Sequence, residues 1–228
     1  MKHLVVLLLA AVAALPARAQ VGTLPSKSPY RDFSFGQDVT VFGGRFGGNE
    51  GKAGVGPRAS SIVGVRYALH ISGPAEFSVR VARAASTRLV LDPSKDGDAR
   101  TLGTQSEALY IADAGLLFAL TGQKSWHHLI PLVGFGLGLV SSGAGQDVGG
   151  YSFGTGFAIQ YGAALRYVTS GNISVRLDWT NYLWQLAYPE SYFNPTATGG
   201  PPVLSTNKSS QWTNNRTLTL GVSYIFSR

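Results

Sequence analysis

Apolar and polar positions alternate through residues 157–184, on both sides of a turn at residues 169–172. Odd-numbered positions carry mostly aromatic and aliphatic side chains, and even-numbered positions carry mostly small, polar or charged ones. Successive side chains of a strand point to opposite faces of a sheet, so this period of two predicts a β-hairpin. Each arm is long enough to cross a bilayer as a tilted strand, which takes about 9–11 residues.

The same alternation recurs along the chain and predicts eight strands. Their approximate bounds are residues 33–44, 60–72, 75–84, 105–120, 126–140, 157–168, 173–184 and 217–226. The connections alternate long and short, as in outer-membrane barrels with long outer loops and short periplasmic turns. We therefore predict an all-β fold, an eight-stranded antiparallel up-and-down transmembrane β-barrel, with no helix beyond the N-terminal segment.

The beginning of the chain predicts export from the cytoplasm. A basic start, an apolar run and an Ala-Arg-Ala cleavage motif follow one another in residues 1–19, which we interpret as a cleaved signal peptide. The apolar run is shorter than the about 20 residues that a transmembrane helix needs. We assign residues 20–32 to an exposed periplasmic lead-in and residues 33–228 to the outer-membrane barrel domain.

Composition agrees with a membrane protein. Charged residues make up 14% of the chain, compared with roughly 25% in ordinary soluble domains. The net charge is +7, and removal of Lys2 and Arg18 with the signal peptide leaves +5. The basic residues are not clustered as nucleic-acid binding requires, so we expect no nucleic-acid partner. The chain contains no cysteine and therefore no disulfide framework.

Alternation alone leaves open a soluble, lipocalin-like barrel, which would place its apolar face inside. The positions of the lysines favour the membrane barrel. Lys27, Lys52, Lys95, Lys124 and Lys208 all fall in predicted loops, turns or the lead-in. A strand face in water normally accepts lysine, whereas a strand face in lipid does not. We therefore predict a location in the cell outer membrane, with outer-membrane lipid as a partner.

Aromatic residues near the strand ends predict interfacial girdles, where amphipathic rings lie at the level of the lipid headgroups. These residues are Trp126, Tyr167, Tyr224 and Phe226 at one end of the barrel and Trp184 at the other.

Two runs carry a resemblance to a known family. The run at residues 131–138, PLVGFGLG, and the ending GVSYIF at residues 221–226 resemble the OmpA-like family of small outer-membrane barrels. The resemblance covers about residues 33–228 and implies a monomeric eight-stranded barrel. It also implies insertion by the barrel-assembly machinery, which reads an aromatic residue at the end of the last strand. Here Phe226 is followed by two further residues.

By parity, nine charged side chains point into the predicted barrel. They are Asp38, Arg66, Glu76, Arg80, Glu107, Asp113, Arg166, Arg176 and Asp178. An eight-stranded barrel has room inside only for side chains, and buried charges have to be paired. We interpret the set as a salt-bridge network that plugs the lumen. The alternative is a gated pore for protons or small solutes.

Enzymes that modify lipids also occur on small barrels, so catalysis is a further alternative. A Ser–His hydrolase acting on the outer leaflet needs its histidine near the long loops. His70, His127 and His128 all fall at the predicted periplasmic end. We therefore expect no enzymatic activity and no cofactor.

One loop partly matches the start of a calcium-binding EF-hand. Asp92, Ser94 and Asp96 have the spacing of the first ligands, but Gly103 occupies the twelfth position, where a bidentate glutamate belongs. We predict a solvated turn without metal, and calcium stays a weak alternative.

The longest predicted loop, residues 187–211, contains Tyr188, Tyr192 and Phe193 among polar residues. Aromatic anchors surrounded by adaptable polar groups suit a surface for an extracellular ligand. Packing of these rings against one another is the alternative. Taken together, the sequence predicts a role in membrane integrity or in adhesion through the outer loops, with a small-solute channel as the alternative function.

Overall fold

The computed structural model describes residues 28–33, 36–169, 171–196, 199–205 and 208–227. The predicted signal peptide and the first part of the lead-in lie outside these residues. No helix among the described residues has the length and apolar character needed to span a membrane. The elements are β1 (Tyr30–Asp32), β2 (Gln37–Phe46), β3 (Ser60–Ser72), β4 (Ala75–Leu91), η2 (Gly97–Arg100), β5 (Thr101–Ala119), β6 (Lys124–Trp126), β7 (Leu129–Ser142), β8 (Thr155–Val168), β9 (Ile173–Ala187), η3 (Glu190–Phe193) and β10 (Ser210–Ser227).

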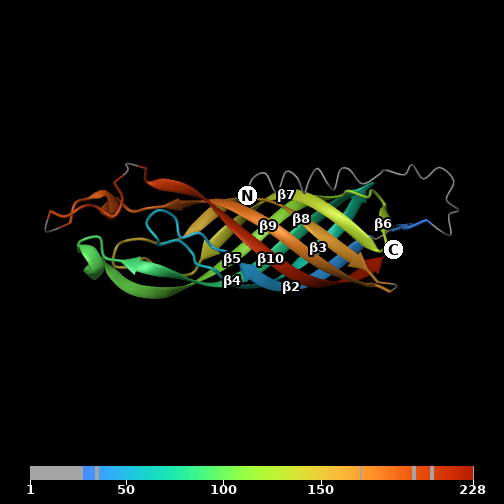
Figure 1. Ribbon diagram of the computed structural model, residues 1–228, viewed down its shortest axis with the longest axis horizontal. Helices are drawn as coiled ribbons and strands as arrows, with labels where there is room; N and C mark the ends of the chain where they lie inside the picture. The colour runs from blue at the N-terminus through green and yellow to red at the C-terminus, as the bar shows by residue number, and fades with distance from the viewer. Residues whose placement is uncertain (1–27, 34–35, 170, 197–198, 206–207, 228) are drawn as a thin grey trace, which may run out of the picture.

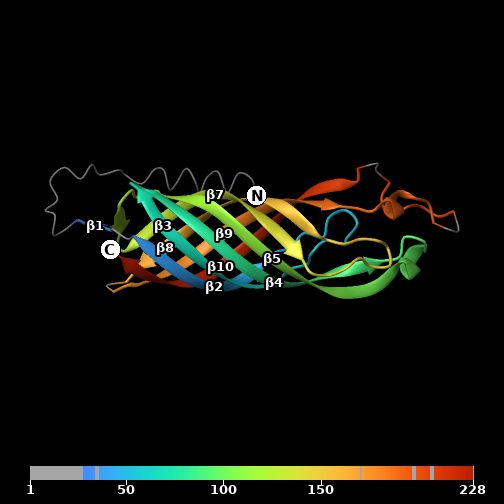
Figure 2. The same ribbon diagram turned by 180° about the vertical axis from the view of Figure 1, so that it is seen from behind.

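Eight of these strands form one closed barrel. Their hydrogen-bonded order is β7-β5-β4-β3-β2-β10-β9-β8, and a pairing between β7 and β8 joins the two ends of the sheet. Each neighbouring pair is antiparallel. Figures 1 and 2 show the tilted strands from opposite sides. The predicted eight-stranded up-and-down barrel is confirmed.

Strand alternation divides the side chains into an outer and an inner set. The exposed fraction is 59% for Leu220 and 63% for Val41, whereas it is 3% for Thr219 and 0% for Thr40. The outer set is apolar and the inner set is largely polar, which is the reverse of a soluble barrel. The outer surface therefore suits lipid, and the lipocalin-like alternative is wrong.

Two hairpins extend beyond the barrel wall at the end with the long loops, on the left in Figure 1. Strand β4 continues to Leu91 and β5 begins at Thr101, where the pattern predicted a polar loop at residues 86–104. Strand β10 begins at Ser210 instead of residue 217. Polar residues occur on both faces of these extensions, and buried ones such as Arg88 and Thr213 point inward. The sequence there therefore lacks the alternation of apolar and polar residues that marks a strand in lipid.

A short two-stranded pairing lies at the other end of the barrel. Tyr30–Asp32, at the end of the predicted lead-in, pair with Lys124–Trp126. Strand β7 then starts at Leu129, slightly later than predicted. The turn before it contains His127 and His128 with φ angles of 48° and 68°. Left-handed backbone at two successive residues redirects the chain and delays the strand.

The inner side of the barrel becomes apolar near the long loops. The buried residues there include Phe46, Ile62, Leu109, Ile111, Val140 and Trp184. Trp184 has an exposed fraction of 0%, and its ring stacks on that of Phe46 at 6.0 Å between centroids. The prediction that Trp184 is an interfacial aromatic is therefore wrong. Even-numbered residues of β9 point into the barrel, so Trp184 lies on the same inner face as Arg176 and Asp178.

Two tryptophans of β9 test the division into inner and outer faces. We expect Trp184→Ala to lower the free energy of unfolding by about 3–5 kcal/mol, because it removes a fully buried ring from a packed layer. Trp179→Ala is the matched control, since Trp179 points outward and is 45% exposed. Urea unfolding in lipid vesicles measures both, and equal losses for the two variants would contradict this assignment.

Candidate functional site

The nine charged residues predicted to point into the barrel are buried there, each at most 5% exposed. Strand alternation accounts for this, because the inner positions are even-numbered on β2, β3, β4, β8 and β9 and odd-numbered on β5. Side chains from six strands therefore meet in one narrow lumen, where they form stacked groups of ion pairs.

The first group lies near the short turns and is centred on Arg166 of β8. Its guanidinium donates to both carboxylate oxygens of Glu76 on β4, each at 2.9 Å. It also contacts Asp38 of β2 at 3.2 Å. One arginine thus links three strands around the barrel through charge-assisted hydrogen bonds, which are the stronger kind.

The second group is centred on Asp178 of β9. Arg66 of β3 donates to it across the lumen, with N–O distances of 3.0 and 3.1 Å. Arg176, on the same strand as Asp178, donates through Nε at 3.0 Å. Within the part of the chain that the structure describes, the two Nη atoms of Arg176 are buried without a hydrogen-bond partner.

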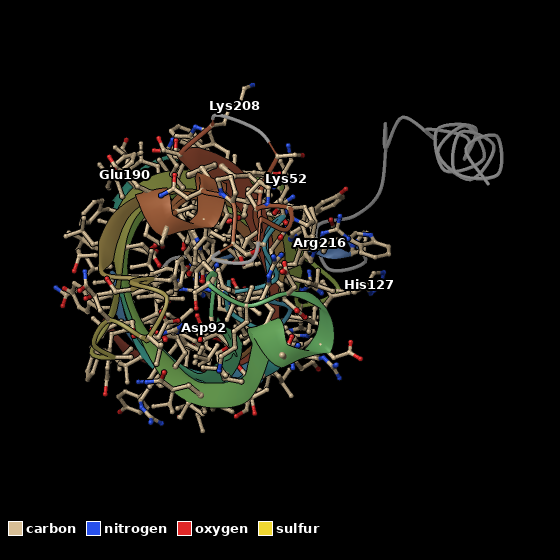
Figure 3. The ribbon with its side chains drawn as sticks, turned by 90° about the vertical axis from the view of Figure 1, so that its left-hand side faces the viewer. Lys52, Asp92, His127, Glu190, Lys208 and Arg216 are labelled. Carbon is tan, nitrogen blue, oxygen red and sulfur yellow. The ribbon has the colours of Figure 1, made fainter. Side chains whose placement is uncertain are left out.

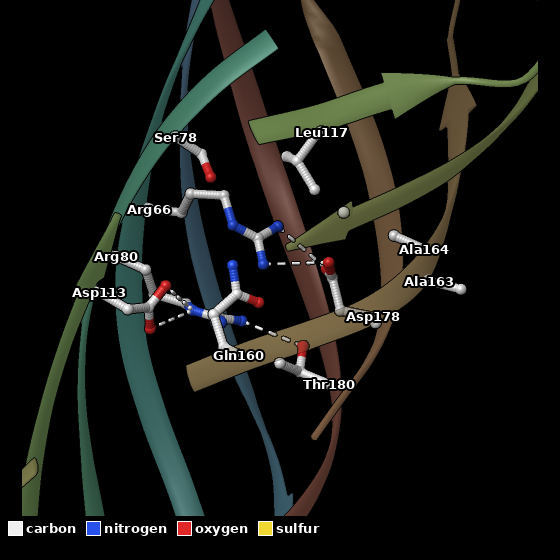
Figure 4. Close-up of a pocket in the computed structure, with 12 residues that line it drawn as sticks. Arg66, Ser78, Arg80, Asp113, Leu117, Gln160, Ala163, Ala164, Asp178 and Thr180 are labelled. Carbon is white, nitrogen blue, oxygen red and sulfur yellow. Dashed lines mark hydrogen bonds and ion pairs between the residues drawn. The ribbon is translucent and has the colours of Figure 1, made fainter. Parts of the chain in front are cut away.

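The third group joins Arg80 of β4 to Asp113 of β5 at 3.0 Å. Arg80 also donates to the Thr180 hydroxyl at 3.2 Å, and the Tyr182 hydroxyl donates to Asp113 at 2.9 Å. Between the second and third groups lies a cavity of about 20 Å³, and Figure 4 shows the side chains around it, Gln160 among them. That volume is enough for about one water molecule.

A fourth group near the long loops contains residues that the sequence pattern missed. Arg88 of β4 contacts Glu107 of β5 and Asp147 of the loop between β7 and β8, each at 2.5 Å. The Tyr151 ring of the same loop lies 5.0 Å from the Arg88 guanidinium. Arg88 has the inner parity of Arg80 and would have been found if β4 had been extended. Only the fold reveals Asp147, because a loop carries it.

Three tyrosines cover this end of the lumen. The rings of Tyr151, Tyr188 and Tyr192 lie 6.2 to 6.4 Å apart between centroids. Tyr192 is 0% and Tyr188 6% exposed, and Phe193 packs against the same core. Burial raises the pKa of the Tyr151 and Tyr192 phenols. The prediction that Tyr188 and Tyr192 anchor an external ligand is therefore wrong, because these rings are buried against the protein, whereas for the half-buried Phe193 it stays a prediction.

The two projecting hairpins contact each other above the tyrosines. The Thr196 hydroxyl donates to Asp96 at 2.9 Å, and Arg100 donates to the carbonyl oxygen of Pro201 at 2.6 Å. Loop residues from opposite walls of the barrel are thus joined across its mouth.

The calcium candidate lies in one of these hairpin loops. Asp92 accepts hydrogen bonds from the Ser94 hydroxyl and amide at 2.6 and 3.0 Å, and these bonds lower the pKa of its carboxyl. Lys95 lies 3.4 Å from Asp92, and Arg100 lies 3.5 Å from Asp96. No group of three or more metal-ligating side chains occurs among the described residues. Both carboxylates thus already contact cationic and hydroxyl groups of the protein.

The remaining girdle aromatics lie where they were expected. Trp126, Tyr167, Tyr224 and Phe226 are between 46% and 57% exposed, near the short turns. Their role as membrane anchors stays a prediction.

A double-mutant cycle tests the first ion-pair group. We expect Arg166→Met to lower the free energy of unfolding by about 3–5 kcal/mol, because it leaves two buried carboxylates without their cation. The double variant Arg166→Met/Glu76→Gln should lose less free energy of unfolding than the sum of the losses of the two single variants.

The rim pair Arg58–Glu50 serves as the control for this cycle, since it has a similar distance of 3.3 Å but side chains that are 33% and 45% exposed. Loss of this exposed pair should lower the free energy of unfolding by at most about 1 kcal/mol. Urea unfolding measures both pairs, and equal effects would contradict a structural role for the buried network.

The sequence matches no protein-family model and no curated protein. The structure is similar to Neisserial surface protein A, with a TM-score of 0.52 and 14% identity over 83% of this chain and 97% of that chain. It is also similar to the outer membrane protein OprG from Pseudomonas aeruginosa, with a TM-score of 0.50 and 8% identity over 86% of this chain and 99% of that one. Ail of Yersinia pestis, solved with the heparin analogue sucrose octasulfate, gives a TM-score of 0.42 and 15% identity over 85% of this chain and 100% of that one. At these identities the likeness concerns the fold, and at that level it agrees with the resemblance to OmpA-like barrels. This chain is thus a transmembrane β-barrel with the fold of the small outer-membrane barrel proteins.

Proposed function

We propose that this protein is a closed outer-membrane barrel that conducts no solute and acts through its long-loop face, in adhesion or in membrane integrity. The observation that carries the proposal is the filling of the lumen. Each buried arginine and each buried acid of the four groups contacts an opposite charge. Five arginines face six acids, so the network lies within one formal charge of neutrality without a passing ion.

The apolar layer supports the same conclusion. Above the three lower ion-pair groups, Trp184 and Phe46 stack at 6.0 Å, and Phe153 meets Trp184 edge-on. Closely packed rings exclude water and therefore hydrated ions. A conducting path would have to displace the ion pairs, this layer and the tyrosines above it.

The projecting β4–β5 hairpin supports a surface role. Strand β5 pairs with β7 only from Leu109 onward, so within the described chain its first part, Thr101–Ala108, has a strand neighbour on the β4 side alone. The side chains from Thr101 to Ser106 are exposed. The β4 edge is partly covered, because the Arg58 amide donates to the Thr87 carbonyl at 2.9 Å. An open strand edge accepts an extended segment of a partner by strand addition.

We further propose that the barrel-assembly machinery inserts this barrel and recognises Phe226 as the signal. We also propose that the barrel is a monomer. The alternative function as a small-solute channel requires that the ion pairs and the apolar layer separate together.

Single-channel recording in a planar bilayer tests the closed lumen. We expect no discrete conductance steps from the wild type, because both the charged and the apolar layers block the path. The combined variant Arg176→Ala/Trp184→Ala/Tyr192→Ala should conduct, since it removes bulk from the charged layer, the apolar layer and the tyrosine cover. Trp179→Ala, which changes only the outer face, serves as the control. Steps in the wild type would refute the closed lumen and favour the channel.

Cell attachment tests the surface role. The barrel is displayed in the outer membrane of a non-adherent Gram-negative host, and attachment to epithelial monolayers is counted. We expect Thr104→Lys/Ser106→Lys to reduce attachment severalfold, because lysines on a strand edge block strand addition. Thr87→Lys, on the partly covered edge of the same hairpin, should have little effect.

Survival in detergent is measured on the same cells to separate the two roles. A gain in attachment supports adhesion, and a gain in survival alone supports membrane integrity. If the wild type changes neither property of the host, the proposed surface role is wrong.

A further inference from the structure

The outer face of the barrel carries an uneven distribution of charge. Among the charged residues on the eight barrel strands of the described chain, three point outward: Arg45, Arg83 and Arg216. They come from β2, β4 and β10, which belong to the continuous wall β10-β2-β3-β4. All three are cations, and the outward positions around them are otherwise apolar or uncharged.

The pairing register places Arg83 and Arg216 within two residue pairs of Arg45, near the outer ends of the barrel strands. Arg45 lies opposite Leu218 on one side and Ser61 on the other. The carbonyl of Arg216 accepts a hydrogen bond from the Gly47 amide at 2.6 Å, so Arg216 lies about two residue pairs further out than Arg45. Arg83 lies opposite Val63, two residue pairs further in than Ser61, the partner of Arg45. An arginine stem is long enough for its head to reach the level of its neighbours.

That depth corresponds to the headgroups of the outer leaflet. On β10 the exposed apolar residues run from Phe226 to Leu218 and end just before Arg216. From Phe226 to Arg216 the strand rises about 25 Å along the barrel axis, with about 3.3 Å per residue and a tilt of about 40°. An apolar band of about 25 Å is the height expected for an outer-membrane barrel. The guanidinium groups thus lie at its outer boundary.

A basic pocket lies further out on the same side. Its volume is about 240 Å³, and its lining includes Lys52, Lys208, Gln211 and Trp212. Gln211 is held in place because its side-chain oxygen accepts hydrogen bonds from the Lys52 amide at 2.9 Å and the Tyr188 hydroxyl at 3.1 Å. Trp212 is 55% exposed and has the outward parity of Arg216. Viewed along the barrel, Lys52, Lys208 and Arg216 lie on one side (Figure 3).

The acid nearest in sequence to this pocket does not neutralise it. Glu50, two residues before Lys52, contacts Arg58 at 3.3 Å. Five cations therefore face outward, three at the level of the headgroups and two further out. Their charge matches phosphate, which arginine binds in a bidentate manner and lysine binds as a point charge.

We propose that the wall β10-β2-β3-β4 is a binding site for a phosphate-bearing glycolipid of the outer leaflet. Arg45, Arg83 and Arg216 bind its phosphates at the membrane surface. Lys52 and Lys208 bind further anionic groups of the headgroup, and the Trp212 ring contacts its sugar. The acyl chains cover the apolar strand positions below the arginines.

The test uses the full barrel in phosphatidylcholine vesicles that contain lipid A with two, one or no phosphates. Bound lipid is counted by native mass spectrometry after mild extraction. We expect enrichment of the doubly phosphorylated lipid over phosphatidylcholine. Each of Arg45→Gln and Arg216→Gln should reduce it about fivefold, the usual contribution of one basic residue at an anionic surface. These side chains are exposed, so folding should persist, and barrel content is checked by circular dichroism.

Lys124→Gln is the matched control, because Lys124 is also an exposed cation but lies at the short-turn end. It should leave the enrichment unchanged. Equal enrichment in the wild type and both arginine variants, or the same loss in the control, would overturn the proposal. Pyrophosphate is added as a soluble competitor. If it binds the barrel in detergent as tightly as the lipid, the site recognises free phosphate and the assignment to a lipid is wrong.

Discussion

Closure of the sheet is the constraint on which the rest of this structure depends. Backbone groups inside a bilayer have no water to bind, so each strand needs a hydrogen-bonded neighbour on both sides. The first and last barrel strands, β2 and β10, pair over Gln37–Phe46, and β7 pairs with β8 on the opposite wall. A ring of eight strands is narrow, and that width decides what the interior can contain.

The narrow ring explains why glycines and arginines occur together. The inner face of β7 carries Gly134, Gly136 and Gly138, and a side chain at Gly136 would meet the amide group of Gln160. The space that these glycines leave open accommodates side chains from neighbouring strands, such as Leu117, Gln160 and Asp113. Small residues on one wall and large charged ones on the others thus fill a single volume. The polar interior is therefore a packed core whose contacts are ion pairs.

The long-loop end is organised differently because it lies outside the membrane. Tyrosine rings and the Arg88–Asp147 pair cover the lumen, while the strands of two hairpins continue past the wall with polar side chains. Packing residues and exposed residues are thus separated in space. The inward rings are unavailable to a partner, whereas the β5 edge and the basic side of the wall are accessible. The proposed surface and lipid roles both rest on that separation.

The strands within the membrane, their number and the inner position of nine charges could be predicted from the sequence, because alternation follows directly from strand geometry. It also marked Trp184 as inward by parity, although its place near a strand end favoured a girdle role. Only the tertiary structure decided which charges pair, since partners such as Arg166 and Asp38 come from distant strands. It also decided that Tyr188 and Tyr192 are buried and that Asp147 reaches Arg88. Loop conformation depends on packing between segments that are distant in the sequence, and no local pattern predicts that packing. In a strand that crosses lipid, by contrast, every second residue is apolar, and this pattern shows which face points outward.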